Sequence, residues 1–463
     1  MALRPALVVL ALLLVAACGA PVPGPSAPAA LDVAGTWTGR LELPGMPMDI
    51  GVTLTGSPAD AGSLDVPAQG IRAMPLADVS AEGGMVRFTV PDLPGGASFA
   101  GTLAADGSAI GGTFTQGGGQ YPLVLRRGEV AAPARPQEPR APLPYRAEDV
   151  TYRGAAGDLT GTLTLPEGTG PFPAVLLITG TGGQDRDESV LGHRPFLVLA
   201  DALTRAGTAV LRVDDRGVGG SAGSVADATY DDLVGDIRAG LAFLRGRGEV
   251  DPARTGLVGH SEGGYLAPLV AQRAPDEVGF AVLIAGPAVS GEDVLVEQNR
   301  LLLAASGETP QQVDEQVAFV RELCRLLRAR DDDAARALIR DRARAQAASL
   351  PPEQRAAAEQ DQIPVDEALR SFVTYDPAPA LQALRVPVLA VYGSKDLQVP
   401  AAQSEPVLRE LLAGHPDATI RTFDGLNHLM QPATTGHPRE YGPTETTMDP
   451  QVLTVIAEWV AAR

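Results

Sequence analysis

The stretch "GLVGHSEGGYLAP", residues 256–268, decides the fold, because it joins a buried-looking apolar run to a helical pattern through a turn rich in glycine. Ser261 lies at this junction, between Gly259 and Gly263. Small residues leave room where the backbones of a strand and a helix nearly touch, and such a turn exposes the serine hydroxyl. The amide of Glu262 then lies at a helix N-terminus beside the serine, where it can stabilise an oxyanion.

The same spacing of glycine and serine occurs a second time, around Ser221 in "GGSAG". The apolar run before it ends near Asp214, and no helical pattern begins after it. We therefore interpret Ser221 as a turn residue. The neighbouring Asp214, Asp215 and Arg216 offer charge pairs that can hold the turn.

Continuous apolar runs, each bounded by glycine or aspartate, predict strands that are buried on both faces of a mostly parallel sheet. They occupy residues 174–180, 208–215, 255–261, 280–286 and 386–393, with a weaker run at 418–425. Helical patterns lie between them, and one apolar stripe is formed by Tyr230, Leu233, Ile237, Leu241 and Leu244. This alternation indicates an α/β fold, which an antiparallel hairpin of "DVTYRG" and "LTGTLTLP" precedes.

The chain divides by composition into several parts. Residues 32–128 alternate apolar and polar residues between turn signals, which predicts a small antiparallel all-β domain, a sandwich or a barrel. Residues 129–147 are rich in proline and are typical of a semi-rigid linker. Residues 148–463 form the α/β domain, with a helical insertion at about 290–380. The insertion is expected either to cover the site as a lid or to form a solvated hairpin away from it.

The N-terminus has the layout of an export signal. Residues 1–17 read as a signal peptide, and "VAAC" at 15–18 resembles a bacterial lipobox, in which Cys18 becomes lipidated. Residues 18–31 suit a flexible tether, so a lipid-anchored protein of the cell envelope is expected. Ordinary secretion, or release into the periplasm, is the alternative. The other cysteine, Cys324, is expected to be a buried small residue.

Composition excludes some kinds of partner. The formal net charge of −19 argues against binding to nucleic acid, whose phosphates it would repel. The five histidines lack metal-ligand spacing, and no Walker-type phosphate loop is present. We therefore expect no metal and no organic cofactor, and membrane contact only through the N-terminal lipid.

A serine hydroxyl needs a base that a third group orients. His428 in "FDGLNHLMQ" follows the last predicted strand, where a loop can bring its ring over the carboxyl edge of the sheet; His437 is the alternate. Asp396 in "GSKDLQVP" follows the strand before, and Asp424 is its alternate. His260 is expected to point away from Ser261, because strand neighbours face opposite sides.

The second oxyanion donor is expected in the loop "TGTGGQDRDES", whose glycines let backbone amides turn inward. We assign it to the amide of Thr181, with Gly182 as the alternate. The charged cluster Asp185, Arg186, Asp187 and Glu188 is expected to brace that loop.

Taken in order, "GTGGQDRDE", "DDRGVGGS", "GHSEGG", "GSKDLQVP" and "LNHLMQ…TGHPREY…ETTMDPQVL" resemble the bacterial α/β-hydrolase esterases over residues 148–463. Several members of that group carry an N-terminal β domain and are exported. The resemblance implies hydrolysis of small carboxylic esters by Ser261, Asp396 and His428. One departure is Thr179-Gly180, where many relatives of the wider superfamily have His-Gly.

The expected reaction is acyl transfer from an ester to water through an acyl-enzyme on Ser261. Two alternatives stay open. The same three residues would also serve an exopeptidase or amidase, and an inactive hydrolase scaffold could instead support a binding lipoprotein of the cell envelope. The sequence leaves the oligomeric state open.

Overall fold

The computed structural model describes residues 32–43, 46–91, 93, 96–117, 119–348 and 363–463. The predicted signal peptide, Cys18 and the tether lie outside the described residues. Within the described ranges, no helix combines the length and the apolar character needed to cross a lipid bilayer.

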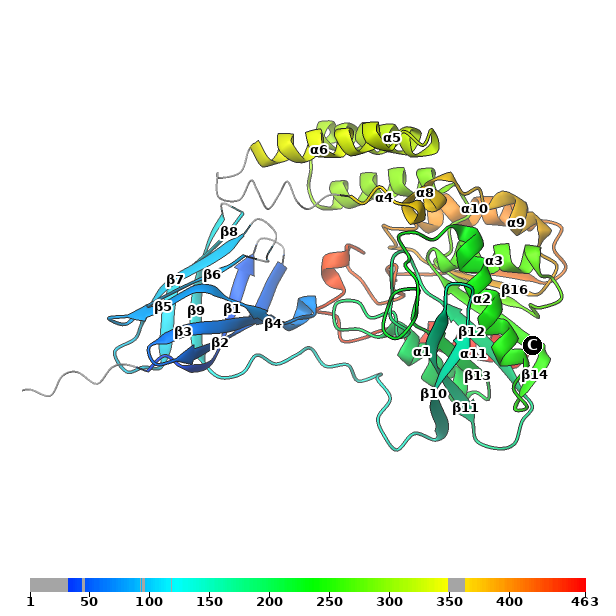
Figure 1. Cartoon of the computed structure of the whole chain (residues 1–463), viewed down its shortest axis with the longest axis horizontal. Helices are drawn as coiled ribbons and strands as arrows, with labels where there is room; N and C mark the ends of the chain where they lie inside the picture. Colours follow the sequence, from blue (N-terminus) through cyan, green and yellow to red (C-terminus); the bar gives the residue numbers. More distant parts are fainter. Residues whose placement is uncertain (1–31, 44–45, 92, 94–95, 118, 349–362) are drawn as a thin grey trace, which may run out of the picture.

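The N-terminal part is one antiparallel sheet of nine strands that curls on itself (Figure 1). Its two edge strands, β4 (Ile71–Pro75) and β5 (Ala77–Glu82), are consecutive in the chain, and Leu76 between them donates its N–H to Gly62 on β3. The remaining strands are β1 (Gly35–Leu43), β2 (Met46–Gly56), β3 (Ala59–Val66), β6 (Met85–Val90), β7 (Ala97–Leu103), β8 (Ala109–Gln116) and β9 (Gly119–Arg127).

The inward positions of these strands are apolar, as the alternation predicted. Trp37, Ile50, Phe88 and Leu125 are all buried in one core inside the curled sheet. A short 3₁₀ turn, η1 (Pro67–Gln69), projects from this domain toward the rest of the molecule.

The second sheet has eight strands in the order β10-β11-β13-β12-β14-β15-β16-β17. The predicted leading hairpin is confirmed as the antiparallel pair β10 (Tyr145–Arg153) and β11 (Asp158–Pro166). The predicted buried runs are confirmed as the parallel strands β12 (Phe172–Ile178), β13 (Ala209–Val213), β14 (Val250–His260), β15 (Ala281–Ile284), β16 (Val388–Gly393) and β17 (Ala418–Phe423).

Helices cover both faces of this sheet, because its strands are apolar on both sides. One face packs against α1 (Pro195–Arg205) and α11 (Pro450–Ala461). The other packs against α2 (Tyr230–Arg245), α3 (Gly263–Arg273), α9 (Ala378–Ala383) and α10 (Ala401–Leu411). The molecule thus consists of an all-β domain followed by a domain with an α/β-hydrolase fold, in which helices, sheet and helices form three layers.

The predicted helical insertion lies between β15 and β16 and has two levels (Figure 1). Helices α4 (Gly291–Ala305) and α8 (Glu367–Thr374) lie nearer the sheet, and α5 (Pro310–Arg328) and α6 (Asp332–Ala348) pack above them. Cys324 is buried in the cluster between these levels, as expected, and burial raises the pKa of its thiol to about 12.

Candidate active site

The turn after β14 has the strained geometry that the sequence predicted. Ser261 has a φ of 54°, and α3 begins two residues later, at Gly263. A Cβ on Gly259 would lie 2.1 Å from the carbonyl oxygen of Gly263, and one on Gly263 would lie 2.3 Å from that of Ile178. Larger residues would therefore push the strand and helix apart and move the serine.

A cavity of about 660 Å³ lies over this turn and contains Ser261 and His428 in its wall. The Nδ1 of His428 is 2.8 Å from Oδ2 of Asp396, whose side chain is fully buried. The backbone N–H groups of Gln398 and Val399 each donate to the other carboxylate oxygen over 2.8 Å. Asp396 is thereby fixed in the orientation that receives an N–H from the imidazole.

The alternates for base and acid lie elsewhere. His437 is hydrogen-bonded through Nε2 to Ser306 at the end of α4, and Asp424 accepts from the hydroxyl of Ser394. Ser221 donates to the carbonyl of Asp214 and accepts from the N–H of Thr160, so it braces its own loop as interpreted. The structure joins Asp396 to His428 by a hydrogen bond and places Ser261 and His428 in the wall of one cavity. His437, Asp424 and Ser221 instead bind partners elsewhere.

The loop after β12 runs beside the serine, since a Cβ on Gly180 would lie 3.3 Å from the Cβ of Ser261. The N–H of Gly180 is occupied, because it donates to Oε1 of Glu188 over 2.8 Å. Among the described residues, the backbone N–H groups of Thr181, of its alternate Gly182 and of Glu262 have no hydrogen-bond acceptor. All three amides are therefore free to receive a negative oxygen, and the choice of Thr181 over Gly182 stays a prediction.

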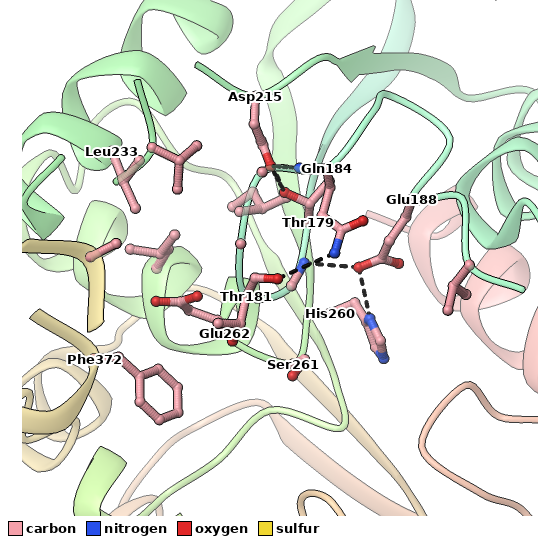
Figure 2. A pocket seen from close by; sticks show the side chains of 18 of the residues that line it. Thr179, Thr181, Gln184, Glu188, Asp215, Leu233, His260, Ser261, Glu262 and Phe372 are labelled. Atoms are coloured by element: carbon pink, nitrogen blue, oxygen red, sulfur yellow. Dashed lines mark hydrogen bonds and ion pairs between the residues drawn. The ribbon is translucent and has the colours of Figure 1, made fainter. Parts of the chain in front are cut away.

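Glu188 and His260 are joined by a hydrogen bond that the sequence analysis did not predict, although it expected Glu188 to brace the loop (Figure 2). Glu188 Oε1 accepts from both Gly180 and His260 Nδ1, the latter at 2.9 Å, and His260 Nε2 is 3.0 Å from the carbonyl oxygen of His428. His260 points away from Ser261, but its ring lies against that of His428, with 4.8 Å between centroids. It thus ties the loop of the candidate base to the loop of the candidate oxyanion donor.

Two features of the sequence point to this hydrogen bond, although strand alternation predicted only that His260 faces away from Ser261. His260 is the residue directly before the serine, and Glu188 belongs to the cluster expected to brace the loop. Burial lowers the pKa of His260, but the Glu188 carboxylate more than offsets it, so that the pKa is raised. The hydrogen bond to His260 then holds Glu188 in place beside Gly180.

Two further acids lie around the same loop, Glu262 buried and Asp215 partly buried. Glu262 accepts from the hydroxyl of Tyr230 at 2.7 Å, and burial raises the pKa of its carboxyl. Asp215 accepts from the Thr179 hydroxyl and from the N–H of Gln184 (Figure 2). Burial raises the pKa of Asp215 to about 7. Among the described residues, Asp215 has no ionic partner, whereas its neighbours Asp214 and Arg216 pair with Arg186 and Asp236.

The insertion contributes to the cavity through α4, α8 and the segment before α8, which supplies Ile363, Pro364 and Asp366. Val294, Leu295 and Gln298 of α4 and Leu369 and Phe372 of α8 line it. Helices α5 and α6 contribute no lining residue among those described. The role of the insertion as a lid stays a prediction, which the lining residues on α4 and α8 support. The described residues include no cluster of three or more ligating side chains that could hold a metal ion.

Comparison with known proteins places this geometry in a family. Residues 194–431, about half of the chain, match the family described as Serine aminopeptidase, S33. The chain belongs to this family. The match includes Ser261, Asp396 and His428, and it identifies the chain as a hydrolase.

Among individual relatives, Esterase EstD of Thermotoga maritima is 28% identical over 323 residues, which are 69% of this chain and 68% of that protein. Among solved structures, the Pyrococcus furiosus esterase Pf2001 has a TM-score of 0.42 at 15% identity, covering 69% of this chain and 90% of its own. Est1E of Butyrivibrio proteoclasticus, solved with ferulic acid bound, has a TM-score of 0.41 at 17% identity, covering 68% and 96%.

Proposed function

We propose that this S33-family hydrolase is a carboxylesterase that uses Ser261 as nucleophile, His428 as base and Asp396 as the group that orients the base. The hydrogen bond of 2.8 Å between His428 and Asp396, at the edge of a cavity that also contains Ser261, carries the assignment of roles. The relationship to Esterase EstD supports esters as the substrate class.

In the first half of the reaction, the Ser261 hydroxyl attacks the ester carbonyl and gives its proton to Nε2 of His428. Asp396 holds Nδ1–H and stabilises the imidazolium. The N–H groups of Thr181 and Glu262 stabilise the negative oxygen of the tetrahedral intermediate. When the bond to the alcohol breaks, the imidazolium returns the proton to the departing oxygen, and an acyl-serine remains.

In the second half, His428 takes a proton from water, whose oxygen attacks the acyl-serine. The same two amides stabilise the second tetrahedral intermediate. It collapses to a carboxylic acid, and the proton returns to the Ser261 oxygen. Atoms and charges balance with water as the only co-reactant.

The test is labelling with a fluorophosphonate together with hydrolysis of an aryl butyrate. Ser261→Ala is expected to lose labelling and to lose kcat by a factor on the order of 10⁴ to 10⁶, because it removes the nucleophile of a concerted set. Ser221→Ala is the matched control and is expected to keep the labelling. A wild-type protein that neither labels nor hydrolyses esters would favour the binding lipoprotein with an inactive scaffold.

An exopeptidase or amidase is the second candidate, which the description of the family favours. Aminoacyl anilides tested beside aryl esters distinguish the two, because both reactions use the same three residues. We expect the ester kcat/KM to exceed the anilide value.

We also propose that the protein is exported and anchored to a membrane by lipid on Cys18. The lipobox-like sequence at 15–18 supports this. The Cys18→Ser substitution is expected to move the protein from the membrane fraction to the soluble fraction, which cell fractionation measures. An unchanged distribution would contradict the anchor.

A further inference from the structure

His260 is the last residue of β14, and each of its two ring nitrogens faces a hydrogen-bond acceptor. Nδ1 lies 2.9 Å from Oε1 of Glu188, and Nε2 lies 3.0 Å from the carbonyl oxygen of His428. A neutral imidazole has one N–H donor and one acceptor nitrogen, so it can satisfy only one of these two contacts. Both contacts are hydrogen bonds only when the ring carries two protons and a positive charge.

The side chain of Glu188 gives a second reason for this charge. Its Oε1 accepts from the N–H of Gly180 over 2.8 Å as well as from His260, so this oxygen carries no proton. Its Oε2 is buried without a hydrogen-bond partner among the described residues, so a proton there would be an unsatisfied donor. A buried carboxylate needs a cation beside it, and His260 is its only ionic partner in the described part of the chain.

The other groups around the ring are consistent with a cation. Besides Glu188, the titratable side chains of the described residues that face it are His428, with 4.8 Å between ring centroids, and Asp396, which is bonded to His428. Burial lowers the pKa of His260, but the charge and hydrogen bond of Glu188, the His428 carbonyl and the charge of Asp396 outweigh burial, so the pKa is raised. A small gap beside the ring is otherwise lined by uncharged side chains, those of Pro195, Phe196, Ile284, Leu429 and Met448.

Loss of one proton from this ring would break one of its two hydrogen bonds. A carboxylate is a stronger acceptor than a carbonyl, so the remaining proton stays on Nδ1. Nε2 then presents a lone pair to the carbonyl oxygen of His428, and two acceptors at 3.0 Å repel each other. The backbone of His428 thereby loses its donor, and the proposed base moves relative to Ser261. Such a displacement of a reacting group lowers the rate.

We propose that His260 is a positively charged positioning residue, whose two N–H groups join Glu188 to the backbone of His428, and that activity falls when this ring loses a proton. The ring exchanges no proton with the substrate in this scheme. The proposal rests on the proposed esterase function. It adds a second titrating group, besides His428, that controls the rate.

Nuclear magnetic resonance of protein labelled with ¹⁵N-histidine tests the charge without any substrate. The His260 resonances, identified by their loss in His260→Gln, are expected to show two protonated ring nitrogens at neutral pH, and one bare nitrogen would overturn the proposal. Glu188→Gln keeps the size and an acceptor oxygen but removes the negative charge. It should therefore move the midpoint of proton loss to lower pH by about one unit or more. Asp227→Asn, at an exposed acid, is the matched control and should leave the midpoint in place.

The dependence of kcat/KM on pH tests the effect on activity. For an aryl butyrate, kcat/KM is expected to rise as His428 becomes neutral and to fall again at the pH at which the His260 ring loses its proton. In Glu188→Gln, this alkaline fall should move to lower pH together with the midpoint of the ring. In His260→Gln, the alkaline fall should disappear, and the plateau should be lower by a factor on the order of 10 to 100.

A purely structural role of His260 would lower kcat/KM equally at every pH. An alkaline fall that persists in His260→Gln, or that stays in place while the ring midpoint moves in Glu188→Gln, therefore overturns the proposal. Should His260→Gln not fold, Glu188→Gln serves both measurements, because the resonances that it shifts identify the ring. Absence of all ester hydrolysis and of fluorophosphonate labelling would instead refute the proposed function, whatever the charge of His260.

Discussion

At the scale of single residues, the site depends on three buried or partly buried carboxylates to which the proposed mechanism gives no chemical step. Glu188 accepts from the N–H of Gly180, Glu262 accepts from the hydroxyl of Tyr230, and Asp215 accepts from a hydroxyl and a backbone N–H. Glu262 and Asp215 have no cationic partner among these contacts. Burying a carboxylate without a cation costs free energy, which protonation relieves. The residues that shape the oxyanion loop therefore make stability depend on pH.

Asp215 gives a test of this dependence. Burial raises the pKa of Asp215 to about 7, against about 3.9 in the unfolded chain. Between these two pH values, the folded state therefore binds more protons than the unfolded chain. The stability that the protonated carboxyl of Asp215 contributes is lost as the pH rises through about 7. The loss amounts to at most about 4 kcal/mol. Asp215→Asn should not lose this stability as the pH rises, because an asparagine side chain does not ionise.

Denaturant unfolding at pH 5 and pH 8 measures the effect. We expect the free energy of unfolding of Asp215→Asn, relative to the wild type, to be clearly higher at pH 8 than at pH 5. Asp227→Asn, at an exposed acid, is the control and should track the wild type at both values. Parallel behaviour of Asp215→Asn and the wild type would contradict the assignment.

At the scale of elements, the proline-rich linker does more than separate the two domains, because part of it is hydrogen-bonded to the hydrolase domain. Residues 134–138, here called the strap, lie against the hydrolase domain. Arg135 donates to the carbonyls of Leu191 and Gly192 in one loop and of Gly442 and Thr444 in another, at 2.8 to 3.3 Å. The first loop follows Glu188 and the second follows His428, so the strap joins two loops that frame the cavity.

His193 strengthens the same junction. It is fully buried, although its polar neighbours at the start of α1 gave no sign of this. Its ring contacts the hydroxyl of Thr447, the carbonyl of Tyr441 and the amide of Gln431. Burial lowers the pKa of His193 to about 4, so the ring stays neutral near neutral pH. The loop that carries Tyr441 into the cavity wall is thereby held from two sides.

Arg135→Ala tests the strap. It leaves four carbonyls without their charged donor, and we expect the free energy of unfolding to fall by about 2 kcal/mol. The kcat/KM for an aryl ester should fall as well. Arg140→Ala, an exposed arginine of the same linker, is expected to leave both unchanged. Equal thermal midpoints for the two variants would show that the strap does not stabilise the junction.

At the scale of the whole molecule, the β domain touches the hydrolase domain close to the same loop. A Cβ on Gly442 would lie 1.5 Å from the carbonyl oxygen of Ala68 in η1. Gly70 faces Leu191 and Gly192 across the same boundary. The absence of a side chain at 442 therefore permits the close approach of the two domains.

Gly442→Ala is expected to separate the domains at this contact. We expect faster proteolysis within residues 129–144 and a larger radius of gyration in solution scattering, while β-domain and hydrolase cores stay folded. Gly414→Ala is the control, because a Cβ there meets no atom within 4 Å. Identical proteolysis of both variants would mean that this contact does not hold the domains together.

The sequence alone predicted most of the α/β domain, because its signals are local. Apolar runs of strand length, the stripe on α2 and the glycines around Ser261 each follow from the backbone geometry of a few neighbouring residues. The order of strands before Ser261, Asp396 and His428 also placed those three at one edge of a sheet. The curled β domain was predicted from alternation in the same way.

The tertiary structure decided the rest, because the contacts join residues far apart in the chain. His260 meets Glu188, Arg135 meets Gly442, and the cavity extends from Ser261 to Tyr152 only when β10 to β14 lie side by side. Leu233 belonged to the predicted core stripe, yet it lines the cavity, since the sheet edge leaves space beneath α2. Local periodicity fixes which face of a helix turns inward, whereas packing of distant elements decides whether that face meets a core or an open cavity.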